Sequence, residues 1–415
     1  MINGHKNSSL GIIPNDWEVN HLGKICDVRD GTHDSPKYHA TGIPFITSKN
    51  LTETKLSFED IKFISKEDHI NFSKRSHVEN GDILFGMIGT VGKPIVVNEE
   101  FEFSIKNVAL LKFGNSKELN NFYALNVLKS SIIDNQFKKM SNGGVLNFVA
   151  LGNIRNLIFP LPPLPEQQKI AEILSTVDDK IEVIDQQIIQ TQELKKGLMQ
   201  RLLSKGIGHT KFKDSPLGMI PESWEVVELG SLLKNIKGGG TPSKDVAEYW
   251  SREIPWATVK DLKKTIINDS IDYISQSGLK NSAANLIPAW TLIISTRMAV
   301  GKAVFFTKDV SINQDLKALF PKNNLNKFFL LHWFFANSEY ILNLASGSTV
   351  KGIRLEVLKA LKIILPKIEE QQKIAEILTS ADDKLEVLIE KKGHYQELKQ
   401  GLMQQLLTGK IRVKV

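Results

Sequence analysis

A long segment occurs twice in this chain, and this repeat limits the possible folds more than any other feature. Residues 165–203 read PEQQKIAEILSTVDDKIEVIDQQIIQTQELKKGLMQRLL, and a closely similar segment spans residues 369–407. The copies align without a gap at an offset of 204 residues, and 23 of the 37 positions from Gln167 to Leu203 are identical. Chance does not produce such a match, so the chain contains two versions of one structural element.

Each copy is predicted to form one long α-helix. Pro165 is favoured in the first turn of a helix, and no later proline interrupts either copy. At 1.5 Å per residue, such a helix is roughly 55 Å long. Its apolar residues recur with the four-three spacing of coiled coils, so we expect the two helices to pack antiparallel along an apolar seam. The seam is expected to contain Ile170, Leu174, Val177, Ile181, Ile184, Ile188, Leu198 and Leu202 of the first copy and Ile374, Leu378, Ala381, Leu385, Leu388, Leu402 and Leu406 of the second.

A region of about 150 residues precedes each helix, and the two regions resemble each other more faintly than the helices do. They begin alike, with LGIIPNDWEVNHLG at residues 10–23 and LGMIPESWEVVELG at residues 217–230. The fold class is therefore predicted as α+β, with two pseudo-repeated globular domains separated by two long helices. The predicted boundaries are 1–157 for the first domain, 158–206 for the first helix, 207–361 for the second domain and 362–415 for the second helix.

Short apolar segments and turn residues predict the same order of elements in both domains. In the first domain we expect strands within 42–51, 82–88, 94–97 and 108–113, with helices at 65–75 and 118–140. In the second we expect strands within 253–262, 290–295 and 303–306, with a helix at 326–345. Each domain should close with a glycine-containing loop, at 141–148 or 345–352.

Composition excludes several classes of protein. With 415 residues and 41% hydrophobic content, the chain can build two cores. It contains no apolar run near 18 residues and no signal-like N-terminus, so we expect no membrane span and a cytoplasmic location. Cys26 is the only cysteine, which excludes an internal disulfide and suggests a buried structural thiol. The net charge of +7 permits a polyanionic partner but is weak evidence by itself.

Motifs for catalysis or metal binding are not recognisable. The segment GMIGTVGKP at residues 86–94 lacks the spacing and the Ser or Thr of a phosphate-binding loop, and Gly238–Gly240 lacks the spacing of a dinucleotide site. No Asn-Pro-Pro-aromatic tetrapeptide of amino-methyltransferases occurs. Asp178, Asp179 and Lys180 are consecutive within one helical turn and so cannot converge on a metal. We therefore predict no catalytic residue and no metal site.

The arrangement of two divergent domains, each followed by a nearly identical helix, resembles the specificity subunits of type I restriction-modification enzymes. The resemblance is carried by Glu166–Leu174 and Glu193–Leu203, their repeats Glu370–Leu378 and Glu397–Leu407, and the segments around Trp17 and Trp224. It implies that each domain recognises one half of a bipartite, asymmetric sequence in double-stranded DNA. It also implies that the helices set the spacing and dock two methyltransferase subunits.

The resemblance further implies which molecules bind elsewhere in such a complex. Restriction and translocase subunits would join through the complex, and no membrane is involved. S-adenosylmethionine, ATP and magnesium would bind to partner subunits, with no cofactor on this chain.

Polar, basic and aromatic loop residues are the candidates for contacts with DNA, because bases are read through side chains and phosphates attract Lys and Arg. In the first domain they are Ser35, Lys37, Tyr38, Ser48, Lys49 and Asn50, with Lys74 and Arg75 expected on phosphates. In the second they are Thr241, Ser243, Lys244, Tyr249, Lys260, Lys263, Lys264 and Arg297.

Two alternatives remain at this point. The chain could be a structural coiled-coil adaptor without affinity for nucleic acid, which explains the helices but not the divergence of two loop-rich domains. It could also be a DNA methyltransferase or nuclease with an unrecognised active site, which labelled methyl transfer by the isolated chain would reveal.

Overall fold

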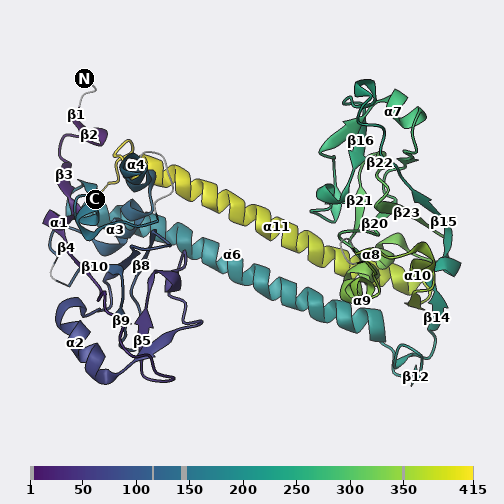
Figure 1. Ribbon diagram of the computed structural model, residues 1–415, viewed down its shortest axis with the longest axis horizontal. Coiled ribbons are helices and arrows are strands. Elements are labelled where there is room, and N and C mark those ends of the chain that lie inside the picture. The colour runs from purple at the N-terminus through teal and green to yellow at the C-terminus, as the bar shows by residue number, and fades with distance from the viewer. Residues whose placement is uncertain (1–3, 115, 142–146, 348–350, 415) are drawn as a thin grey trace. The chain divides into compact units, whose positions relative to one another are not determined.

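The computed structural model describes residues 4–114, 116–141, 147–347 and 351–414. The chain forms two compact units, and the division falls inside both long helices (Figure 1). Unit 1 contains residues 1–185 and 390–415, and unit 2 contains residues 186–389. Each unit therefore combines one globular domain with half of each long helix.

Unit 1 is built around a four-stranded antiparallel sheet with strand order β4-β10-β7-β8. A second sheet has three strands in the order β6-β5-β9. Strand β5 is antiparallel to β6 and parallel to β9. Two small antiparallel pairs, β1-β2 and β3-β11, complete the strands found among the described residues of unit 1. The strands are β1 His5–Ser8, β2 Gly11–Pro14, β3 Glu18–His21, β4 Asp27–Asp30, β5 Ile43–Ile46, β6 Lys62–Ile64, β7 Ile83–Gly86, β8 Gly92–Val96, β9 Ser104–Ile105, β10 Val108–Lys112 and β11 Ile158–Leu161. The short helices are α1 Leu22–Ile25, α2 Lys66–Ser76, α3 Asn121–Leu128, α4 Ser131–Met140 and α5 Leu151–Arg155, with a 3₁₀ turn, η1, at Ser48–Asn50.

Unit 2 follows the same plan. Its sheet β15-β23-β20-β21-β17 keeps the order of the central sheet of unit 1 and adds one strand, and its second sheet has the order β18-β16-β22-β19. The strands are β12 Phe212–Lys213, β13 Ile220–Pro221, β14 Glu225–Glu228, β15 Leu233–Gly238, β16 Ile254–Ala257, β17 Ile266–Ile267, β18 Asp272–Ile274, β19 Leu286–Ile287, β20 Leu292–Ser295, β21 Ala303–Phe306, β22 Val310–Ile312, β23 Leu316–Pro321 and β24 Lys362–Leu365. The short helices are η2 Leu229–Leu232, η3 Ala247–Tyr249, η4 Val259–Asp261, α7 Gln276–Lys280, α8 Lys327–Ala336, α9 Ser338–Asn343 and α10 Leu355–Lys359. The predicted α+β class and pseudo-repeat are thus present.

The helices predicted at 118–140 and 326–345 are each divided into two shorter helices. The segment 118–140 forms α3 and α4, because Ser130 leaves the helix and its hydroxyl caps α4 by accepting from the Ile132 amide. The segment 326–345 forms α8 and α9, because Asn337 leaves the helix and bonds the Trp333 carbonyl through its side chain. Ser and Asn side chains compete with the helical backbone in this way, which the apolar periodicity did not reveal.

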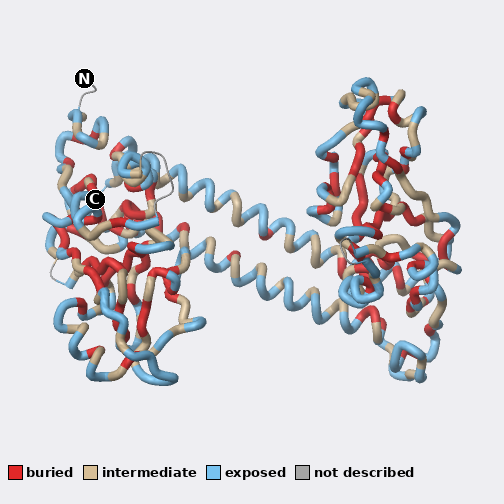
Figure 2. Tube along the Cα trace, viewed as in Figure 1, coloured by how far each residue is buried: buried red, intermediate tan, exposed pale blue. Residues whose placement is uncertain are grey.

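The cores lie between the sheets and the helices, where the buried residues concentrate (Figure 2). Trp17 and Trp224, from the matching starts of the two domains, are fully buried. Cys26 is buried as predicted, and burial raises the pKa of its thiol to about 12, which keeps it unreactive. The predicted loops at 141–148 and 345–352 include residues 142–146 and 348–350, which lie outside the described residues.

The long helices are α6 Leu164–Lys205 and α11 Ile368–Leu406, and within each unit their halves run antiparallel (Figure 1). In unit 1, Asp178 pairs with Lys399 at 2.6 Å and Asp185 pairs with Lys392 at 2.6 Å, so the partner number falls as the α6 number rises. In unit 2, Lys195 pairs with Asp382, which is the same Asp–Lys pair in the repeat.

Apolar residues join the helix halves to the domain cores. The core of unit 1 contains Ile170, Leu174 and Leu406, and that of unit 2 contains Leu202, Ile374 and Leu378. Every residue predicted for the seam is buried or half-buried. In the described part of the chain, no helix combines the length and apolar character needed to cross a membrane.

Candidate nucleic-acid interface

The start of each long helix is anchored by a buried glutamine. The Gln167 side chain accepts the Asn120 amide at 2.9 Å and donates to the carbonyls of Glu118 and Pro162. Gln371 makes the same three bonds with Asn326, Asn324 and Pro366. Because burying a polar side chain is costly unless its hydrogen bonds are satisfied, these bonds fix the helix to its domain.

A glutamate beside each glutamine binds the buried tryptophan of the same unit. Trp17 Nε1 donates to Glu166 at 3.0 Å, and Trp224 Nε1 donates to Glu370 at 2.8 Å. The second partner differs between units. Arg412 donates to Glu166 at 2.7 and 2.8 Å, whereas His209 Nε2 lies 2.8 Å from Glu370.

Two glycines allow the chain to turn back onto these sites after each long helix. Gly206 and Gly409 have φ of +66° and +71°, which a side chain disfavours. A Cβ at Gly206 would also overlap Trp224, and one at Gly409 would overlap Pro14. The helices therefore end in equivalent turns that close unit 2 and unit 1 respectively.

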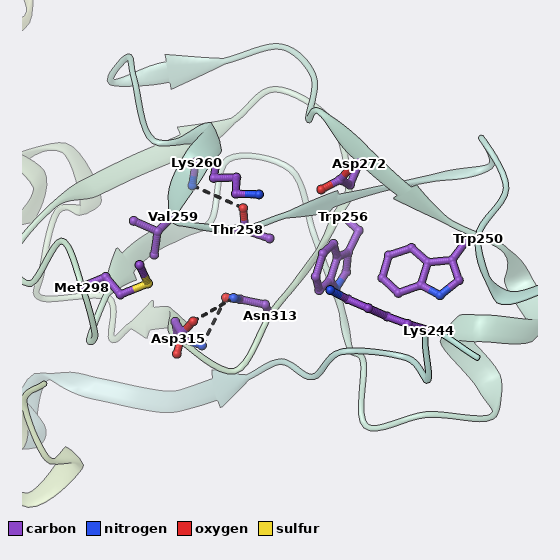
Figure 3. Close-up of a pocket in the computed structure, with 10 residues that line it drawn as sticks. All are labelled: Lys244, Trp250, Trp256, Thr258, Val259, Lys260, Asp272, Met298, Asn313 and Asp315. Atoms are coloured by element: carbon purple, nitrogen blue, oxygen red, sulfur yellow. Dashed lines mark hydrogen bonds between the residues drawn. The ribbon is translucent and has the colours of Figure 1, made fainter. Parts of the chain in front are cut away.

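Unit 2 contains a pocket of about 560 Å³ at the edge of its second sheet (Figure 3). Its lining combines two aromatic, two basic, two acidic and several other side chains: Lys244, Trp250, Trp256, Thr258, Val259, Lys260, Asp272, Met298, Asn313 and Asp315. They come from the loop after β15, from β16 and η4, from β18, from the β20–β21 hairpin and from the loop after β22. The size is within the usual range for a ligand site.

The pocket side chains are held by local contacts. Trp250 and Trp256 pack edge to face at 5.2 Å between ring centroids, and their indole N–H groups donate to the carbonyls of Ser243 and Gly240. The Asn313 amide nitrogen donates to Asp315 at 3.0 Å. The arrangement offers aromatic surface, positive charge and fixed hydrogen-bonding groups together, which suits a partner with phosphates and aromatic bases.

Several residues predicted in unit 2 gather at this pocket. Lys244 and Lys260 line it. Arg297 lies 3.6 Å from Asp315, and the Thr241 hydroxyl donates to Gln314, which precedes Asp315.

Other predicted residues lie beside or away from the pocket. Ser243 and Tyr249 belong to its loop and bond through their carbonyls, to Trp250 and to the Ser275 amide. Lys263 is exposed and does not line the pocket, and Lys264 pairs instead with Glu386 of α11 at 3.3 Å.

Sequence reasoning missed most of the lining. Trp250, Trp256, Asp272, Asn313 and Asp315 were not predicted. Trp250 and Trp256 could have been recognised as candidates from the sequence. They lie within seven residues of each other, one at the end of a polar loop and one in the strand that follows.

In unit 1, the aromatic and basic candidates are exposed. Tyr38 carries the Lys62 ammonium 4.2 Å from its ring centroid and lies against Phe45. Ser35 accepts a hydrogen bond from Lys106 at 2.5 Å. Lys37, Lys49 and Lys74 are also exposed.

Arg75 has a structural partner in unit 1. It pairs with the buried carboxylate of Asp30, which also lies 2.9 Å from His33 Nε2. The His33 ring in turn lies 2.6 Å from Asn107. Lys62, Lys106 and His33 are basic residues of this region that sequence reasoning missed.

Ser48 and Asn50 require a correction. Both are buried, at 4% and 8% exposure. The Ser48 hydroxyl accepts the Met87 amide, and the Asn50 side chain accepts the Thr47 amide at 2.9 Å. Ser48 therefore satisfies backbone groups of distant segments, and Asn50 satisfies the backbone of its own loop, so neither side chain belongs to the candidate surface.

The long helices also carry exposed apolar residues that are identical in both copies. Unit 1 exposes Val183 and Leu398, at 52% and 49%, and unit 2 exposes their counterparts Val387 and Leu194, at 58% and 60%. The seam does not require them, because they do not pack in it. Each unit therefore exposes one copy of each residue, Val183 and Leu398 in unit 1 and Val387 and Leu194 in unit 2. We call these four residues the repeated helix surface.

The family model described as type I restriction modification DNA specificity domain matches residues 14–193 and 221–400. The chain belongs to this family. The two matches coincide with the two copies of domain plus long helix, so the family unit occurs twice. Among the described residues, no group of three His, Cys, Asp or Glu side chains could hold a metal ion.

Relatives cover nearly the whole chain. The type I restriction enzyme MjaX specificity subunit of Methanocaldococcus jannaschii is 32% identical over 99% of this chain and 97% of its own length. The MjaVIII specificity subunit of the same organism is 29% identical over 97% and 94%. The solved type I restriction-modification S subunit of M. genitalium has a TM-score of 0.60 at 14% identity over 94% of this chain and 96% of that one, which supports the same fold.

Proposed function

We propose that this specificity subunit reads a bipartite, asymmetric DNA sequence, with one half-site recognised by the domain of unit 1 and the other by the domain of unit 2. The observation that carries the proposal is a contrast within the repeat. The helix anchors recur residue by residue, whereas the loops that expose aromatic and basic side chains differ. Domains that read different half-sites must differ at their base contacts, and a shared scaffold need not.

In unit 2, we assign DNA contact to the face that holds the pocket. Lys244 and Lys260 supply the positive charge that phosphates require. A carboxylate can accept from the cytosine amino group, so Asp315 is suited to reading a base edge. The buried Asn313 side chain bonds both the carboxylate and the backbone amide of Asp315 and so holds it in place. The pocket loops thus combine contacts for affinity with contacts for sequence.

In unit 1, we assign the corresponding role to the exposed loop around Tyr38. Lys37 and Lys49 are candidates for phosphates, and Lys74 and Arg75 extend the basic surface from the end of α2. Ser35 is exposed and remains a candidate for a polar contact.

The repeated helix surface is proposed to dock two copies of a methyltransferase subunit. Exposed apolar side chains lower solubility and contribute nothing to the helix seam. The same exposed residues nevertheless recur in both copies of the repeat, which indicates that both copies bind the same kind of partner. Two equivalent surfaces on one chain suit two identical subunits. Methyl transfer, cleavage and the binding of S-adenosylmethionine, ATP and magnesium are assigned to partner subunits, and the complex to the cytoplasm.

The long helices are further proposed to set the distance between the half-sites. Continuous helices are the stiffest elements available for this purpose, and both copies of the repeat contribute to them. The number of base pairs between the two half-sites would then depend on the length of the helices and not on the loops.

Reconstitution tests the proposal. The chain should transfer no labelled methyl group to DNA alone, and should direct methylation to one bipartite sequence when a methyltransferase subunit of the family is added. Methyl transfer by the isolated chain, or methylation without a defined sequence, would contradict the assignment.

Docking is tested in the same assay with the double variant Leu194→Asp and Leu398→Asp, which charges both copies of the repeated helix surface. We expect it to lose binding of the methyltransferase subunit. The matched control is Ile189→Asp, because Ile189 is equally exposed on α6, at 48%, but its counterpart in the repeat is Gly393. Equal losses in both variants would show that any charge on the helix is harmful and that the surface has no special role.

A further inference from the structure

The hairpin between β20 and β21 places a methionine where unit 1 has a glycine. Both hairpins end in Val-Gly-Lys, at residues 91–93 and 300–302. The Gly89 amide donates to the Asn147 carbonyl at 2.9 Å, and the Met298 amide donates to the Lys351 carbonyl at 3.1 Å. The two residues therefore hold the same position in the two units.

This position requires a left-handed backbone. Gly89 has a φ of +72° and Met298 a φ of +64°. Glycine adopts this conformation without strain, whereas a residue with a side chain does not. Unit 2 therefore keeps a strained methionine at a place where its own repeat shows that glycine suffices.

Packing does not offset the strain. The Met298 side chain is 66% exposed, more than any other large apolar side chain of the described residues. Strain without a stabilising contact in the free chain indicates that the contact forms with a partner.

The surroundings of Met298 identify the kind of contact. It lines the pocket together with Asn313 and Asp315, and Figure 3 shows it beside Val259 and Asp315. The Asp315 carboxylate can accept hydrogen bonds from a base edge, whereas the thioether side chain of Met298 offers mainly apolar contact. In the major groove, the apolar group that distinguishes one base from the others is the C5-methyl group of thymine.

We infer that Met298 is a specificity-determining residue that contacts the C5-methyl group of a thymine in the half-site read by unit 2. The inference rests on the proposed function, because it requires that the pocket face contacts DNA. It adds the identity of one base and the residue that reads it.

The test measures binding of the complete complex, chain plus methyltransferase subunit, to its mapped target after single thymines are replaced by uracil. This replacement removes only the methyl group. For the natural chain, one replacement in the unit 2 half-site should weaken binding about fourfold, the value expected for burying one such group. Met298→Gly should bind that uracil duplex and the thymine duplex equally, whereas Met298→Leu should retain part of the preference.

Two controls separate this role from a structural one. Uracil in the unit 1 half-site should affect the natural chain and Met298→Gly alike, and Met298→Gly should unfold at the same or a higher temperature because its backbone strain is relieved. A unit 2 half-site without thymine, or uracil effects that persist in Met298→Gly, would overturn the inference while leaving sequence recognition intact. Absence of any sequence preference would instead overturn the proposed function.

Discussion

Removal of the Arg412 guanidinium should destabilise unit 1 and leave unit 2 unaffected. Arg412 binds Glu166, whose side chain is 2% exposed and whose remaining bond is the one from Trp17 Nε1. Arg412→Ala removes the positive partner of this buried carboxylate. Breaking a fully buried ion pair costs about 3–5 kcal/mol.

The expected magnitude is smaller, because Arg412 itself is 42% exposed and water can reach the carboxylate from that side. We therefore expect a loss of about 2–3 kcal/mol. For a unit of roughly 210 residues, this corresponds to a decrease of about 4–12 °C in the unfolding midpoint.

The assay is ¹⁹F NMR of chain labelled with 5-fluorotryptophan. Trp17 is the one tryptophan among residues 1–185 and 390–415, and Trp224 occupies the equivalent site in unit 2. Arg412→Ala should lower the midpoint of the Trp17 signal and not that of the Trp224 signal. The double variant Glu166→Gln with Arg412→Ala should recover most of the loss, because a neutral amide can still accept from Trp17.

Two results would refute this reasoning. If the double variant were as unstable as Arg412→Ala, the buried charge would not be the cause. If the Trp17 midpoint did not change, the ion pair would contribute nothing to the stability of unit 1.

Two further predictions concern unit 2 and the long helices. Burial, with the nearby Lys195 charge, lowers the pKa of His332 to about 4, from an unfolded value near 6.5. The unfolded state then binds the proton more readily than the folded state. The free energy of unfolding should therefore keep its full value above pH 6.5 and decrease by about 3 kcal/mol as the pH drops toward 4. The variant His332→Asn should lose this pH dependence of stability; Asn is the residue at the equivalent position of unit 1, Asn126. Urea unfolding of the natural chain and of His332→Asn at pH 7 and pH 4.5 measures the difference in their free energies of unfolding. Inserting four residues between residues 183 and 192 adds roughly 6 Å of helix and should lengthen the preferred DNA spacer by one to two base pairs, whereas two residues rotate the seam by about 200° and should abolish binding. Methylation mapping across a library of spacer lengths measures both insertions, and an unchanged preference with four residues would show that the helices do not set the distance.

The sequence predicted the features that depend on local patterns. The repeat and its apolar spacing indicated both long helices. The helix predicted at 65–75 is α2, whose start is capped by the Ser65 hydroxyl accepting the Asp68 amide. The segment 303–306 is the strand β21. These elements could be predicted because neighbouring residues along the chain determine them.

Features that depend on distant contacts could not be predicted in this way. The pocket brings Trp256 and Asn313 together because β16 pairs in parallel with β22, and nothing in either segment specifies that register. Polarity alone suggested that Ser48 and Asn50 face a partner, whereas Ser48 bonds the distant backbone of Met87 and Asn107 and Asn50 bonds its own loop. Met298 was missed because its conformation, not its residue type, is the unusual feature.

The division of the chain has a consequence for biosynthesis. Unit 2 is one uninterrupted stretch, residues 186–389, whereas unit 1 needs residues 390–415 to complete its helix pair and to bring Arg412 to Glu166. As the polypeptide leaves the ribosome from its N-terminus, the first domain emerges early but lacks half of its helix pair, with its apolar seam uncovered. Unit 2 has all of its residues before that half arrives, so the domain translated second is the first that can finish folding. During this interval the uncovered half of α6 in unit 1 is the segment most in need of protection by a chaperone.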